Sequence, residues 1–120
     1  MPLDKSAIIG ARDITTRTVD VPEWGGAVIV RVFDGRARDE VDAFVARSVD
    51  KSGNLVNPSG MRVLVCRLAL CDESGAPLFT PADEAALHGK SGLALDRVFK
   101  AAAEINGLSD SGVEAARKTF

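Results

Sequence analysis

The sequence predicts an α+β fold in which an N-terminal β-hairpin is followed by about five helices, packed as a small, mostly α-helical domain. Three observations support this prediction. A β-branched run broken by a Pro/Gly turn lies near the N-terminus, apolar residues then recur at helical spacing, and cap signals divide the remainder into helices. A chain of 120 residues has the usual size of one domain, so we expect residues 1–120 to form a single domain.

The N-terminal part of the sequence predicts an arm followed by the hairpin. Residues 1–14 mix charged and small side chains without a period, and we expect them to form a loose arm. Residues 17–33 are rich in β-branched side chains and contain one Pro/Gly turn signal, which is typical of a β-hairpin. Val19 and Val21 alternate with polar residues, as expected for a strand with one apolar face.

Two helices are predicted after the hairpin. The first lies between Asp34 and Asp50, and the second begins near Asn57 and Pro58, an N-cap followed by proline at the first helical position. The second helix runs to Cys71 and is apolar nearly all round, so we expect it to be the most buried. The apolar side of the first helix consists of Val41, Phe44, Val45 and Val49.

Cap signals predict the remaining helices. The segment 80–83, Thr-Pro-Ala-Asp, has the pattern of a capping box and predicts a short helix to about Leu87. Ser91 can cap a longer helix that Asn106-Gly107 would end, and a last short helix is predicted from Ser109. The apolar stripe of the longer helix consists of Leu95, Val98, Phe99, Ala102 and Ile105.

The two cysteines, Cys66 and Cys71, are predicted to lie on one helix. Five helical steps separate them by about 140° around the axis and about 7.5 Å along it, which does not suit a disulfide. We therefore interpret both as small buried apolar residues.

Charge and hydropathy exclude two classes of partner. Fifteen basic and seventeen acidic residues give a net charge of −2 and form no basic stripe, so no nucleic acid partner is expected. No apolar stretch approaches the roughly 20 residues that span a bilayer, and the N-terminus lacks the apolar core of a signal peptide. We expect no membrane partner and a cytoplasmic location.

Short motifs that suggest phosphate or calcium binding fail on their spacing. Gly89-Lys90-Ser91 matches the end of a P-loop, but the earlier glycine of that motif would be Glu84. Residues 50–54 offer oxygen ligands at alternate positions, but the glycine of a calcium loop would be Leu55 and its glutamate Met61. We expect neither a nucleotide nor a calcium ion to bind.

His88 is the only histidine of the sequence. Without a second histidine or paired cysteines it lacks the partners of a zinc site. As a general base it would have only Ser91 and Asp83 nearby, at spacings that suit no catalytic arrangement. The sequence therefore predicts a non-enzymatic protein with no cofactor.

Four aromatic residues at the ends of elements are the candidate protein-binding residues. Trp24 lies at the predicted hairpin turn, and its packing back over the helices as a core residue is an open alternative. Phe79 precedes a helix, where it could equally act as a hydrophobic staple. The candidate interface set is Trp24, Phe33, Phe79 and Phe120.

Several segments together resemble the tail assembly chaperones of long-tailed bacteriophages and prophages. The resemblance extends from about residue 15 to the end of the chain, and it depends on the order and spacing of the segments. They are Val21-Pro22-Glu23-Trp24-Gly25-Gly26 with the Val-Ile-Val-Arg strand after it, Leu70-Cys71-Asp72-Glu73, Pro77-Leu78-Phe79-Thr80, Lys90-Ser91 and Asn106-Gly107-Leu108-Ser109.

The resemblance implies a protein that acts in the host bacterial cytoplasm during tail morphogenesis. Such a protein binds the tape measure protein, keeps that long helical chain soluble, and recruits subunits of the major tail tube protein. It then leaves and is absent from the finished virion. A homo-oligomer is a further expectation.

Two other hypotheses remain open. The chain could be a structural phage protein of the neck or of head-tail completion, which would be retained in the particle. It could also be a small enzyme or nucleotide-binding domain, in which case His88 or Lys90 would be essential. Mass spectrometry of virions separates the first alternative from a chaperone, and alanine variants of the two residues test the second.

Overall fold

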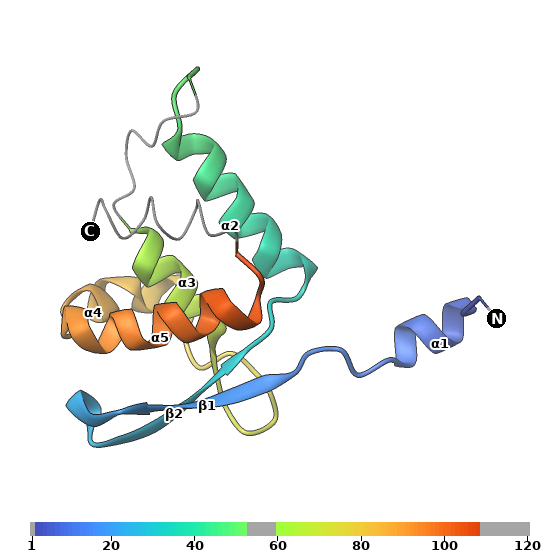
Figure 1. Ribbon diagram of the computed structural model, residues 1–120, viewed down its shortest axis with the longest axis horizontal. Coiled ribbons are helices and arrows are strands. Elements are labelled where there is room, and N and C mark those ends of the chain that lie inside the picture. Colours follow the sequence, from blue (N-terminus) through green and yellow to red (C-terminus); the bar gives the residue numbers. More distant parts are fainter. Residues whose placement is uncertain (1, 53–59, 109–120) are drawn as a thin grey trace.

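A computed structural model describes residues 2–52 and 60–108 of the chain. A three-stranded sheet and the helices that cover it form the body, and a short helix stands apart at the N-terminus (Figure 1). The predicted α+β class is confirmed. The elements are α1 (Lys5–Gly10), β1 (Thr16–Val21), the 3-10 turn η1 (Pro22–Trp24), β2 (Gly26–Arg31), α2 (Gly35–Ser48), α3 (Met61–Ala69), β3 (Leu70–Cys71), the 3-10 turn η2 (Pro81–Asp83), α4 (Glu84–His88) and α5 (Gly92–Ile105).

The predicted hairpin is present as β1 and β2. The two strands pair antiparallel, from Thr16 opposite Arg31 to Val21 opposite Gly26. Gly25 closes the turn with a φ of 76°, a left-handed conformation that glycine adopts without steric cost.

The second predicted helix is shorter than the sequence suggested. It ends at Ala69, and the chain continues as strand β3, in which Leu70 pairs with Val30 and Cys71 with Ile29 of β2. The prediction that both cysteines lie on one helix was therefore wrong, because only Cys66 is helical. Pairing with β2 provides Leu70 with backbone hydrogen bonds that a further helical turn would otherwise supply.

Helix α3 is the most buried helix, as predicted. Every residue from Val63 to Ala69 is buried, including Arg67. Gly60, with a φ of 97°, precedes the helix. The predicted start at Asn57 and Pro58 lies outside the described residues.

Helix α2 is present as predicted, but less of its apolar side is buried than the sequence suggested. Asp34 caps it, since the Asp34 Oδ1 atom accepts a hydrogen bond from the Ala37 N–H at 2.8 Å. Val41 is buried and Phe44 half-buried, whereas Val45 is exposed. The helix therefore contacts the body along only part of its apolar side.

The predicted caps of α4 and α5 are confirmed. The Thr80 N–H donates to the Asp83 Oδ2 atom at 2.7 Å in the turn that leads into α4. Ser91 caps α5, because its Oγ atom accepts a hydrogen bond from the Ala94 N–H at 3.3 Å. Asn106 ends α5, and the helix predicted from Ser109 lies outside the described residues.

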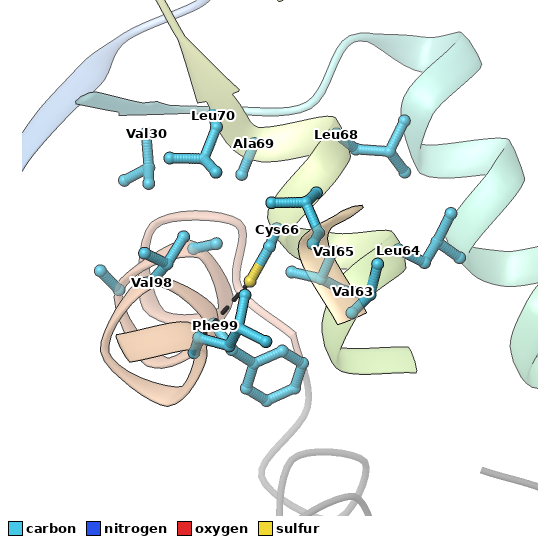
Figure 2. Packing of buried hydrophobic residues seen from close by; sticks show 14 of the residues in the cluster. Val30, Val63, Leu64, Val65, Cys66, Leu68, Ala69, Leu70, Val98 and Phe99 are labelled. Carbon is cyan, nitrogen blue, oxygen red and sulfur yellow. Dashed lines mark hydrogen bonds between the residues drawn. The ribbon is translucent and has the colours of Figure 1, made fainter. Parts of the chain in front are cut away.

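The core lies between α3, α5 and the sheet. Figure 2 shows Cys66 of α3 facing Val98 and Phe99 of α5, with Val30 of β2 and Leu70 of β3 above them. All five side chains are buried. The long stripe of α5 thus packs against the central helix, as its apolar period predicted.

The N-terminal arm contains a helix that the sequence did not predict. Residues 5–10 form α1, capped by Asp4, whose Oδ1 atom accepts a hydrogen bond from the Ala7 N–H at 2.8 Å. All residues from 2 to 18 are exposed, and α1 lies apart from the helices of the body (Figure 1). Six residues are too few to show a helical period in sequence.

Candidate interaction surface

Trp24 lies at the end of η1 and packs against the edge of the core. The side chain is half-buried. Its position therefore fits the alternative in which Trp24 packs back over the helices, rather than an exposed residue at the tip of the hairpin. The neighbouring Glu23 carboxylate accepts two hydrogen bonds from the Arg97 Nε atom, at 2.8 and 2.9 Å. These bonds hold the pKa of Glu23 below its ordinary value, and they fix the hairpin turn against α5.

Phe33 is a core residue. Its side chain is only 7% exposed, and it belongs to the buried cluster that includes Ala37 and Val41 of α2. The residue lies two positions after the end of β2 and directly before Asp34, the cap of α2, where the chain turns toward that helix. Phe33 therefore does not offer a surface to a partner in this conformation.

Phe79 is half-buried and packs against the core next to α4. It precedes Thr80, the residue before η2, which is the place of a hydrophobic staple. Phe120 lies outside the described residues. Of the four predicted interface residues, the structure thus places three at or within the core and brings none of them together as an exposed patch.

Exposed aliphatic residues concentrate instead in the N-terminal arm. Ile8 and Ile9 of α1 are 58% and 78% exposed, and Leu3 and Ile14 are exposed beside them. Burying one such side chain contributes about 1.5–3 kcal/mol, so four within twelve residues are a strong signal for association. The further exposed large apolar residues of the described chain are Val45, Leu78 and Leu93.

A buried arginine links three helices, and sequence reasoning missed it. Arg67 of α3 has a side chain that is 8% exposed. Its Nη2 atom lies 2.7 Å from the Glu40 Oε2 atom of α2, and its Nε atom lies 3.1 Å from the Glu84 Oε1 atom of α4. A charge within an otherwise apolar helical run is a signal that could have indicated such a pair.

Two further polar groups, the buried Arg31 and the half-buried Asn106, hold the end of the hairpin to the helices. The Arg31 Nε atom donates to the Leu68 carbonyl at 3.0 Å. The Asn106 side chain accepts from the Phe33 N–H at 2.6 Å and donates to the carbonyls of Arg31 and Ala102 at 3.3 and 2.9 Å. These groups satisfy backbone atoms at the ends of elements.

The cysteines are inert thiols. Burial raises the pKa of Cys66 to about 12, and the thiol donates to the Leu95 carbonyl at 3.4 Å. Burial also raises the pKa of Cys71. Nucleophilic thiol chemistry requires the thiolate, which neither environment favours.

The residues weighed for catalysis lie at the ends of helical elements. His88 is exposed at the end of α4, and Ser91 serves as the cap of α5. Within residues 2–52 and 60–108, no group of three His, Cys, Asp or Glu side chains could hold a metal ion. None of the helices in the same ranges has the length and apolar character needed to cross a membrane.

The comparison with solved structures shows which known protein this chain resembles. No protein-family model and no curated protein matches the sequence. The structure is similar to that of the bacteriophage HK97 tail assembly chaperone, with a TM-score of 0.58 and 25% sequence identity, over 88% of this chain and 95% of that chain. This chain has the fold of a phage tail assembly chaperone. The resemblance indicated by the sequence segments is confirmed.

The segments that carry this chaperone resemblance have structural roles here. Segment 21–26 forms the turn of the hairpin, with Gly25 at positive φ. Asp72 closes the loop after β3, because its Oδ1 atom accepts hydrogen bonds from the Ser74 hydroxyl and from the Ser74 and Ala76 N–H groups, which lowers its pKa. Asn106 ends α5 and holds the hairpin. The segments described here therefore stabilise turns and helix ends of the folded chain.

Proposed function

We propose that this chain is a tail assembly chaperone that binds the tape measure protein and recruits subunits of the major tail tube protein in the host bacterial cytoplasm. The observation that carries the proposal is the similarity to the HK97 tail assembly chaperone over nearly the whole of both chains. The chain acts during tail morphogenesis and leaves before the virion is complete.

The surface of the chain supports a role in binding protein. The aliphatic residues of the arm, Leu3, Ile8, Ile9 and Ile14, are exposed and offer apolar area for a partner. A long helical client presents apolar stripes that such residues can cover. The mixed surface charge, with a net charge of −2, suits a protein client better than nucleic acid.

Two measurements test the proposal. The soluble fraction of the tape measure protein, expressed with and without this chain, should rise when the chain is present. Mass spectrometry of purified virions should then find the tape measure protein and not this chain. An unchanged soluble fraction contradicts the chaperone role, and stoichiometric amounts of the chain in virions would make it a neck or head-tail completion protein.

A further inference from the structure

We infer that α2 is a displaceable cover over a helix-binding face of α3, and that this face takes an amphipathic helix carrying a carboxylate. The inference deepens the proposed function and rests on it, because it names the part of the chain that would hold a helical client. Three observations support the inference. They are the small number of buried residues in α2, the apolar face of α3 that α2 covers, and the buried charge of Arg67 between the two helices.

Helix α2 buries fewer side chains than α5 does, although Phe44 also packs against the core. Only Ala37, Val41 and Ser48 of its fourteen residues are buried, whereas α5, of equal length, has seven buried residues. Ser48 uses its hydroxyl to donate to the Phe44 carbonyl of α2 itself, so it adds no bond to the body. Elements with little buried apolar surface open locally at the smallest free-energy cost.

The face beneath α2 belongs to the central helix. Leu64, Arg67 and Leu68 share one side of α3, because residues three and four positions apart are neighbours on a helix. Figure 2 shows Leu64 and Leu68 pointing from α3 toward α2. Opening of α2 would expose this apolar pair without unpacking Cys66 from α5.

Charge specifies the kind of helix that this face accepts. Glu40 of α2 meets the Arg67 Nη2 atom at 2.7 Å, while Glu84 of α4 holds the Nε atom and keeps the guanidinium in place. A helix that replaced α2 would need an apolar stripe and a carboxylate at the position of Glu40. A neutral or basic residue there would leave one side of a buried cation unpaired, which is costly.

Hydrogen exchange of the full chain measures the opening. We expect the Glu40→Gln variant to increase amide exchange in α2 at least tenfold while exchange in α5 stays unchanged. The matched variant Glu84→Gln removes the other carboxylate and should increase exchange in α4 but not in α2. Equal exchange of α2 and α5 in the unmodified chain, or no selective change in the Glu40→Gln variant, would overturn the inference.

A peptide measures the preference for a carboxylate. The probe is a synthetic peptide with the sequence of residues 34–49, and its control is the same peptide with Glu40→Lys. Fluorescence anisotropy should show that the first binds the Glu40→Gln chain at least tenfold more tightly than the second, and equal affinities would refute the charge requirement. If these tests fail while the tape measure protein still co-purifies with the chain, the client binds elsewhere and the proposed function stands.

Discussion

At the scale of single residues, buried and half-buried polar groups join the elements. Arg67 connects α3 to α2 and α4, and Asn106 connects the end of α5 to the end of the hairpin. If either group is removed, its hydrogen-bond partners are left unsatisfied away from water. The loss of folding free energy is then larger than that for an exposed hydrogen bond.

We expect Asn106→Ala to lower the free energy of unfolding by about 2 kcal/mol, because the buried Phe33 N–H and the Arg31 carbonyl lose their partner. Asn106→Asp keeps an acceptor for the Phe33 N–H and should lose less. Urea denaturation of the two variants and the unmodified chain measures both effects. An alanine variant as stable as the unmodified chain would show that the asparagine does not join these elements.

Burial of Cys66 makes stability depend on alkaline pH. The pKa of Cys66 is raised from 9.0 to about 12 in the folded chain, so the folded chain retains a proton that the unfolded chain loses. The stability of the folded chain is unaffected by this difference while the pH lies below the ordinary thiol pKa. Stability is lost as the pH rises toward the pKa of the folded chain. We expect the free energy of unfolding to fall by about 1 kcal/mol per pH unit in that window.

Cys66→Ala provides the control for this pH dependence. Alanine cannot titrate, so the variant should lose much less stability than the unmodified chain between a neutral and a strongly alkaline buffer. Urea denaturation at both pH values gives the comparison. If the two proteins lose stability equally, titration of Cys66 is not the cause.

At the scale of elements, the sequence predicted the helices and the hairpin whose positions depend on nearby residues. The capping box of Thr80 and Asp83 locates the turn into α4, Ser91 locates α5, and the β-branched run locates the hairpin. Strand β3 was not predictable in this way. Leu70 and Cys71 continue an apolar helical run, and only their pairing with β2, some forty residues earlier, makes them a strand.

Positions at the ends of elements did not show which of the candidate interface residues are buried. Aromatic residues at element ends were proposed as interface residues, yet Phe33 is buried because the turn toward α2 encloses it. The charge of Arg67 within an apolar run indicates that a partner is needed, but its partners lie on helices distant in sequence, so the sequence does not show which carboxylates they are. Exposure of the arm depends on what the rest of the chain leaves uncovered, which a one-dimensional pattern does not show.

The central position of α3 can be tested by comparing the same substitution at a buried and at an exposed leucine. Leu68 is 6% exposed, and Leu68→Asp would place a charge in the core, so we expect an unfolded or insoluble product. Leu93 is 69% exposed, and Leu93→Asp should change the free energy of unfolding by less than about 0.5 kcal/mol. Circular dichroism melting compares the two. A folded Leu68→Asp variant with an unchanged melting temperature would mean that the core lies elsewhere.

At the scale of the whole molecule, the chain combines a packed body with an exposed apolar arm. The body resembles a tail assembly chaperone, and its caps, turns and buried arginine specify that fold. The arm contributes exposed aliphatic residues that the body does not cover. This arrangement supports the proposed role in binding other protein chains.

We expect the double variant Ile8→Asp, Ile9→Asp to keep the stability of the unmodified chain, because both side chains are exposed in α1. The free energy of unfolding in urea should change by less than about 0.5 kcal/mol. The same variant should solubilise less of the co-expressed tape measure protein. A clear loss of stability would show that the arm packs on the body.

The central claim is that this chain holds a long helical tail protein during assembly. Light scattering coupled to size-exclusion chromatography, on the chain alone and after co-expression with the tape measure protein, tests it most directly. The account predicts a stable complex that contains both proteins, or a defined oligomer of the chain that the tape measure protein rearranges. A strict monomer that elutes unchanged in the presence of the tape measure protein would contradict it.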